Sequence, residues 1–123
     1  WWYSTVGNDQ STDAFADEAL ADYFSRKAHL SIRSSRCKTD RLDRATQAYS
    51  DYCYFEVIYV QGARFLDKLR KDFGSTQFKS AIRAYTKDNR NDISNNARLL
   101  EAFRAKMGNG VLPRYRNRFP SIY

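Results

Sequence analysis

The sequence is poor in the residues that build small metal sites: it holds one histidine, two cysteines and one methionine in 123 residues. The lone His29 cannot supply the two imidazoles of a catalytic zinc site, and we expect it to face water at a helix end. Cys37 and Cys53 form no CxxC pair and have no histidine at metal-binding spacing, which excludes a zinc finger. A disulfide between them requires Cα atoms within about 7 Å of each other. The sequence favours two unpaired thiols.

Long apolar runs are also absent. No segment approaches the roughly 20 apolar residues that a transmembrane helix needs, so we expect no membrane span. The basic and apolar regions of a signal peptide are missing as well. The chain begins with Trp1, Trp2 and Tyr3 rather than with methionine. We therefore expect a chain cut from a longer protein, and its compartment stays undetermined.

What the sequence does contain is enough for one domain. Hydrophobic residues make up 42% of the chain, and Phe and Tyr together number 17. The mean hydropathy of -0.73 and the 28% of charged residues are typical of a soluble chain. No internal repeat, low-complexity segment or inner boundary interrupts it, so we expect residues 1–123 to form a single helical subdomain.

The net charge of +7 is distributed unevenly along the chain. Residues 1–30 carry a net charge of −3, whereas residues 31–123 carry +10. Such an excess is typical of proteins with an anionic partner. The bases also recur at three- and four-residue spacing, as in Arg64, Lys68 and Lys71, which indicates that they lie on the solvent-exposed faces of helices. The spacing favours solvated faces over an anion-binding surface.

Apolar residues recur at spacings of three and four, and period-two alternation is scarce, so the sequence predicts an all-α fold. Short connections favour an array of about five antiparallel-packed amphipathic helices. Thr12 or Asp13 is placed to cap the first helix, and Ser75 the fourth. Gly74 and Gly108 are placed to end the third and fifth helices. The first three helices are expected over residues 13–30, 39–51 and 55–73, and the second has an apolar face of Leu42, Ala45, Tyr49 and Tyr52. The fourth begins at 75 and ends at a loop at 87–92. The fifth carries Leu99, Leu100, Phe103 and Met107, and a short segment, 112–119, follows it.

An acidic pair lies in the first of these helices. Glu18 and Asp22 are one turn apart, and Arg26 is one turn further on. Their spacing alone favours a column of charges facing water, and acids near a helix start also complement the helix dipole.

The segment WWYSTVGNDQSTDAFADEALADYF, residues 1–24, resembles the M1 family of zinc metallopeptidases, the gluzincin aminopeptidases. In that family an HExxH helix is followed by Gln, an aromatic pair, often a VGNDQ-like segment, and a helix of the pattern W-L-[ND]-E-G-[FL]-A-x-Y. FADEALADY aligns with that helix, with Ala19 in place of Gly and Phe15-Ala16 in place of Trp-Leu. If HExxH-Gln directly preceded Trp1, 18 residues would separate its second His from Glu18, which is the family's spacing.

This resemblance implies that Glu18 is the third ligand of a catalytic Zn²⁺ whose two histidine ligands lie before Trp1. Asp22 matches a frequent acid of the family and would accept a hydrogen bond from a ligating histidine, which fixes the tautomer of that histidine. Pairing of Asp22 with Arg26 is the alternative.

A second block, YVQGARFLDKLRKDFG at residues 59–74, resembles the family pattern Y-x-K-G-[AS]-x-[FLV]-[LF]-x-x-L-R-x-x-[LI]-G. The resemblance implies that Tyr59 donates a hydrogen bond to the oxyanion of the tetrahedral intermediate. Spacing alone favours a core position for Tyr59, and Gln61 stands where the family has Lys. Gly62 is expected either to let its helix approach a neighbouring backbone closely or to be a tolerated helix glycine.

Two later segments, STQFKSAIRAYTKDNR and ARLLEAFRAKMGNGV, resemble helices of the same family in pattern, and residues 25–58 match least. The resemblance implies the C-terminal helical subdomain of a thermolysin-like peptidase domain, with peptide as substrate, Zn²⁺ in the parent protein and the HExxH-bearing part as its partner. We expect the isolated chain to be inactive and to bind no zinc. Its face near Glu18, with Trp1 and Trp2, should be exposed or covered in a homodimer.

Two other functions stay open. One is a basic helical module that binds nucleic acid or another anion, for which the RYRNRF tail interleaves bases with aromatic residues. No recognised nucleic-acid motif accompanies it. The other is a noncatalytic relative of the peptidases that acts as a protein-interaction scaffold.

Overall fold

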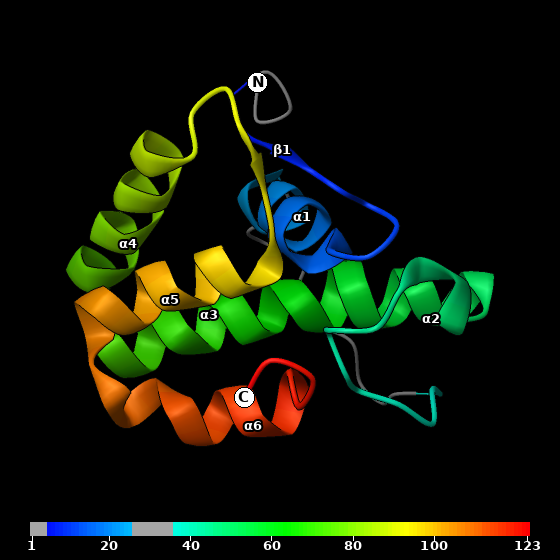
Figure 1. Ribbon diagram of the computed structural model, residues 1–123. Helices are drawn as coiled ribbons and strands as arrows, with labels where there is room; N and C mark the ends of the chain where they lie inside the picture. Colours follow the sequence, from blue (N-terminus) through cyan, green and yellow to red (C-terminus); the bar gives the residue numbers. More distant parts are fainter. Residues whose placement is uncertain (1–4, 26–35) are drawn as a thin grey trace.

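The computed structural model describes residues 5–25 and 36–123, and this part of the chain is mostly helical, as predicted. Figure 1 shows α3 crossing the molecule, with α4 at one end of it and α6 lying along it. Within these two ranges, none of the helices combines the length and the apolar character that crossing a membrane requires. The elements are η2 (Phe15–Ala19, π-helical), α1 (Leu20–Ser25), η3 (Thr46–Ala48, 3₁₀), α2 (Asp51–Tyr54), η4 (Phe55–Gln61, π-helical), α3 (Gly62–Phe73), α4 (Ser75–Asp88), α5 (Asn96–Met107), η5 (Asn109–Val111, 3₁₀) and α6 (Leu112–Arg118).

The first helix consists of the π-helical turn η2 followed directly by α1, and every side chain of η2 is buried. The prediction that Thr12 or Asp13 caps this helix is wrong. The amide of Ala16 donates instead to Oδ1 of Asn96, at 2.8 Å. A residue at the start of α5 therefore satisfies the first turn of this helix. The predicted end, residues 26–30, lies outside the described residues.

The helix predicted over residues 39–51 does not form. Of the four residues expected on its apolar face, only Leu42 is fully buried, and Tyr52 is 49% exposed. The backbone bonds to a distant element instead, because the amide of Leu42 donates to the carbonyl of Arg118 at 2.7 Å. These tertiary contacts replace the helix with an irregular path that contains one short 3₁₀ turn, η3.

Cys37 and Cys53 form a disulfide, with Cα atoms 5.7 Å apart. The expectation of two unpaired thiols is therefore wrong. The bridge spans a sequence separation of 16 and ties the irregular segment to α2. Spacing could not show the pairing, because the two Cα atoms are brought together by the fold of the segment between them.

The third predicted helix is longer than expected. It runs without a break through α2, η4 and α3, from Asp51 to Phe73. Ser50 caps it by accepting a hydrogen bond from the amide of Cys53 at 3.4 Å. Gly74 ends it at a φ of 96°, as predicted.

Gly62 lies where this helix packs against the first one. A Cβ atom on Gly62 would lie 2.7 Å from the Cβ of Ala19 and 3.3 Å from the ring of Phe15. Real Cβ atoms essentially never come this near to another heavy atom. Of the two readings of Gly62, the close approach is confirmed.

The fourth and fifth helices, α4 and α5, pack against each other. Ser75 is the first residue of α4 and does not cap it, because the cap position is held by Gly74, which has no side chain. The Ser75 hydroxyl accepts a hydrogen bond from Arg70 Nη1 at 3.3 Å. The helix extends to Asp88, into the predicted loop. Gly108 follows α5 with a φ of 78°, which confirms the predicted end.

A short parallel pair of strands, which the sequence did not predict, joins two distant segments. β1 (Gly7–Asn8) pairs with β2 (Ile93–Ser94), and the amide of Gly7 donates to the carbonyl of Asp92 at 3.0 Å. The pair holds the segment before the first helix against the connection between α4 and α5.

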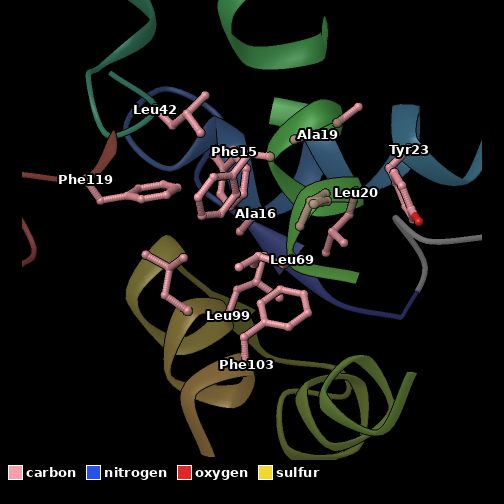
Figure 2. Close-up of a cluster of buried hydrophobic side chains, with 14 of the residues drawn as sticks. Phe15, Ala16, Ala19, Leu20, Tyr23, Leu42, Leu69, Leu99, Phe103 and Phe119 are labelled. Carbon is pink, nitrogen blue, oxygen red and sulfur yellow. The ribbon is translucent and has the colours of Figure 1, made fainter. Parts of the chain in front are cut away.

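The core lies where the first helix, α3, α5 and α6 meet (Figure 2). Phe15 packs edge-on against Phe119, with ring centroids 4.8 Å apart, and against Phe65 at 5.8 Å. The final segment forms α6, and its Tyr115 donates a buried hydrogen bond to the carbonyl of Leu100 at 2.8 Å. The end of the chain is therefore part of the core.

Candidate functional site

Glu18 and Asp22 are buried. Glu18 is 9% exposed and Asp22 is 7% exposed, and the neighbouring Asp17 is 2% exposed. The column of charges facing water that spacing favours is therefore wrong for Glu18 and Asp22, and Arg26 lies outside the described residues. Three carboxylates in six positions are taken out of water, although burial of an ionised carboxylate is costly unless a partner compensates it.

The arrangement of the first helix explains this burial. It packs against η4, α3 and α5, so that its surface is covered from several directions. The expectation that the face near Glu18 is exposed is therefore wrong, and Trp1 and Trp2 lie outside the described residues. The homodimer stays a prediction, but the burial of Glu18 removes the reason for placing it at this face.

The carboxylate of Asp17 is buried, and only one of its two oxygens accepts a hydrogen bond from the described residues. Its Oδ2 accepts a hydrogen bond from Gln10 Nε2 at 2.7 Å, while Oδ1 is buried and has no hydrogen-bond partner among the described residues. Burial raises the pKa of Asp17; the bond from Gln10 opposes this shift, and the charge of Glu18 adds to it. The neighbouring acids therefore interact with one another in an environment that favours neutral groups.

The opposite wall of the site is η4, and this turn also contains a buried acid. Glu56 is 1% exposed and accepts hydrogen bonds from the amide of Arg36 at 3.3 Å and from Gln61 Nε2 at 3.2 Å. Sequence reasoning missed Glu56, although a signal was present. It is the only charged residue in the otherwise apolar run FEVIYV.

Tyr59 also lies on η4 and is half-buried. Its ring stacks on Phe55, with centroids 5.7 Å apart, and meets Tyr54 edge-on at 5.8 Å. It packs against the core without being enclosed by it. The two aromatic contacts fix the ring while leaving the side chain at the edge of the core.

Tyr54 lies beside Tyr59, with ring centroids 5.8 Å apart. Burial raises the pKa of the Tyr54 phenol, the charge of Glu18 raises it further, and hydrogen bonds with Thr46 and Tyr59 act in the opposite direction. The charge of Glu18 therefore acts on a phenol whose ring packs against Tyr59. Sequence reasoning missed Tyr54, because nothing in its spacing distinguishes it from Tyr52.

Both walls of the site are π-helical. Glu18 belongs to η2 and Tyr59 to η4, and these two turns contact each other. π-Helical turns are rare, and they occur frequently at functional sites because the wider turn redirects side chains. The site therefore lies where two unusual turns face one another.

The described residues do not form a complete metal site. No group of three or more His, Cys, Asp or Glu among residues 5–25 and 36–123 is arranged to hold a metal ion. His29, the single histidine of the chain, lies outside these ranges. For a zinc ion of the kind that the resemblance implies, the described residues offer Glu18 and no imidazole.

Comparisons of the chain with protein-family models, with curated proteins and with solved structures give no match. The resemblance to the M1 peptidases consequently rests on the motifs quoted from the sequence.

Proposed function

We propose that this chain is the C-terminal helical subdomain of a zinc-dependent peptidase of the M1 type, an antiparallel array of helices that hydrolyses peptides only together with an HExxH-bearing part. Glu18 is its metal ligand and Tyr59 its oxyanion donor. The observation that carries the proposal is the contact between η2, which contains Glu18, and η4, which contains Tyr59. Two residues that the resemblance marks in separate sequence blocks thus lie on turns that pack together.

The burial of Glu18 suits a metal ligand. A carboxylate that is 9% exposed gains most from a cationic partner, since little water remains to solvate it. Asp22 lies one turn further along the same helix and is 7% exposed, which suits an acceptor for the N–H of a ligating imidazole. When zinc is bound, its chemistry is to make a water molecule acidic near neutral pH. Both imidazoles would come from residues that this chain does not contain.

Tyr59 suits a donor to developing negative charge. Its phenol is neutral at pH 7 and can donate a hydrogen bond. The contacts with Phe55 and Tyr54 hold the ring in place before substrate arrives, so that little reorganisation is needed during the reaction. The chain alone lacks the imidazoles and is expected to be inactive, and zinc-dependent peptide hydrolysis by these 123 residues would refute that expectation.

The test uses the protein encoded by the complete reading frame. Glu18→Gln should lose most of the bound zinc and the activity, whereas Tyr59→Phe should keep the zinc and lower kcat by about 10²–10³-fold. Asp22→Asn should weaken zinc affinity by about 10–100-fold. Zinc content is measured by mass spectrometry and turnover with a fluorogenic aminoacyl substrate.

Matched controls separate these roles from general damage. Tyr52→Phe removes a phenol from a ring that is 49% exposed, and Glu101→Gln removes a carboxylate that is 57% exposed. Both controls should behave like the wild type. Undiminished zinc in Glu18→Gln, or equal losses of kcat in Tyr52→Phe and Tyr59→Phe, would contradict the proposal.

The alternative of a nucleic-acid-binding module finds little support at the RYRNRF tail. Tyr115 and Phe119 are 0% exposed, so neither ring is available for base stacking. Arg114 is paired with Asp72 at 2.7 Å. Binding of single- or double-stranded nucleic acid that weakens steeply with salt would revive this function.

A further inference from the structure

A groove lies between α4 and the end of α1. It consists of two adjoining hollows, of about 530 Å³ and about 200 Å³, and Phe24, Ile82 and Arg83 line both of them. The helix α4 lies at the edge of the molecule in Figure 1. Neither Glu18 nor Tyr59 lines the groove, so a function of this groove is independent of the peptidase proposal.

The apolar part of the groove is open to water. Phe24 is 50% exposed, and its ring meets Tyr23 edge-on with centroids 5.3 Å apart. Ile82 is half-buried beside it, and the ring of Phe78 lies deeper, at 2% exposed. These side chains form a joined apolar surface with charged residues around it. Such a surface is typical of a site that another molecule covers.

The charged side chains that line the groove, among the described residues, are all bases: Arg70, Lys79, Arg83, Lys87 and Arg90. Arg70 pairs with Asp67 at 2.9 Å. The other four are exposed and form no salt bridge with a described residue. Residues 1–4 and 26–35 contain no Asp or Glu. Asp88 follows Lys87 in the chain but lines a separate hollow, between α4 and α5. No carboxylate of this chain therefore pairs with these four bases.

On α4 the groove presents a row of bases and, beside it, a row of mostly apolar residues. The two rows are Lys79, Arg83 and Lys87, and Phe78, Ile82 and Thr86. Residues four apart on a helix are separated by about 6 Å along its axis. A second helix that carries carboxylates four residues apart has the same repeat, so its acids can lie opposite successive bases. A small anion would contact only one or two of them.

We propose that the groove between α1 and α4 docks an acidic amphipathic helix of a partner protein. The carboxylates of that helix pair with Lys79, Arg83 and Lys87, and its apolar side chains lie against Phe24 and Ile82. Helices that dock in grooves bind through apolar anchors at spacings of three and four residues. Opposite charges across the interface set the choice of partner and its register. Nucleic acid would match the bases but would leave the apolar row without a use.

The first measurement is fluorescence anisotropy on the 123-residue chain with a labelled helical peptide of about 15 residues. In this peptide glutamate recurs every fourth residue, a leucine stands three residues after each glutamate, and the other residues are alanine. It should bind with a Kd below about 100 μM. Peptides with every Glu→Gln, with every Leu→Ala or with a central Ala→Pro should each bind at least about tenfold more weakly. Failure of the acidic peptide to bind, or equal binding of the Leu→Ala peptide, would overturn the proposal, as would tighter binding of oligothymidylate.

Variants of the chain locate the binding. Arg83→Gln and Phe24→Ser should each weaken binding of the acidic peptide by about tenfold or more. Arg116→Gln is the control for charge, because Arg116 is an exposed base of α6 that does not line the groove. Tyr52→Ser is the control for the ring, since Tyr52 is 49% exposed and also lies outside the groove. Losses in the controls equal to those in the groove variants would overturn the proposal. If Phe24→Ser does not fold, unchanged affinity in Arg83→Gln overturns it.

Two further measurements separate a partner protein from the other occupants of the groove. The protein encoded by the complete reading frame should bind the acidic peptide as tightly as the 123-residue chain does. Binding by the shorter chain alone would show that another part of the same protein covers the groove, and would overturn the proposal. Sedimentation of the 123-residue chain tests for a second copy. A dimer that is lost in Arg83→Gln and dispersed by the peptide would make a second copy the occupant, and would also overturn the proposal.

Discussion

The side chains of Asp13 and Asn96 each accept a hydrogen bond from an amide at the start of the other residue's helix. Asp13 Oδ1 accepts a hydrogen bond from the amide of Asn96 at 2.9 Å, and Asn96 Oδ1 accepts one from the amide of Ala16 at 2.8 Å. The starts of the first helix and of α5 are therefore joined, 83 residues apart in sequence. The first amides of a helix have no acceptor within that helix, and each of these side chains supplies an acceptor to the opposite helix.

Loss of either side chain should destabilise the fold. Asp13→Ala should lower the free energy of unfolding by about 0.5–2 kcal/mol, as for other helix caps. Asn96→Ala should cost about 1–3 kcal/mol, because Asn96 is 2% exposed and its loss leaves the amide of Ala16 buried without a partner. Urea unfolding measures both. Gln77→Ala, on an exposed residue of α4, is the control, and equal stability of all three variants would contradict the exchange of caps.

A side chain at position 62 should strain the contact between the two helices of the acidic site. Gly62→Ala should cost about 1–3 kcal/mol, because the added Cβ would lie 2.7 Å from that of Ala19. Removing the opposing methyl group in Ala19→Gly should relieve the clash, although glycine in a helix itself costs about 1 kcal/mol. The double variant should therefore be more stable than the sum of the two single changes predicts. Simple additivity would show that the contact does not limit the packing.

The disulfide should stabilise the chain mainly by restricting the unfolded state. For a loop of about 15 residues the expected contribution is about 3 kcal/mol. The double variant Cys37→Ser, Cys53→Ser should lose this amount, and a thiol reductant should lower the stability of the wild type to the same level. The reductant should leave the double variant unchanged. A wild type that is indifferent to reductant would contradict a stabilising bridge.

Asp43 should contribute stability that is lost in acid. Burial favours its neutral form, but hydrogen bonds from Arg41 and from the amide and side chain of Ser121 outweigh this and hold the pKa of Asp43 below 3.8. Because the folded pKa is lower than the unfolded one, the unfolded chain binds the proton more readily. The contribution is therefore complete above pH 3.8 and is lost as pH falls through the folded pKa.

The variant Asp43→Asn tests this sign. It should be less stable than the wild type at pH 7, by about 1–3 kcal/mol for the lost charged hydrogen bonds. The difference should shrink as the pH falls below 4 in melting-temperature measurements. Asp88→Asn, on an exposed residue, is the control. A constant difference between Asp43→Asn and the wild type across this range would contradict the assignment.

The parts of the fold that the sequence predicted are local. The period of apolar residues predicted the helical class, and Gly74 and Gly108 marked two helix ends that the structure confirms. Residues 39–51 show where this approach failed. Their pattern suited a helix, but hydrogen bonds to α6 and a disulfide to α2 hold them in another conformation. Tertiary contacts outweigh helix propensities of a few tenths of a kcal/mol per residue.

The sequence predicted part of the candidate site and missed the rest. The resemblance to the M1 family singled out Glu18, Asp22 and Tyr59, and their roles remain proposals. The burial of the acids, including Glu56 in η4, and the packing of Tyr54 against Tyr59 were not predicted, since they depend on how distant parts of the chain pack together.

The sequence by itself determined that the chain is helical and where several helices end, because those properties depend on neighbours within a few residues. Only the tertiary structure decided which charges are buried, which side chain caps which helix and that Cys37 meets Cys53. These outcomes depend on contacts between residues far apart in the chain. The free energy of such contacts exists only once the whole core has formed.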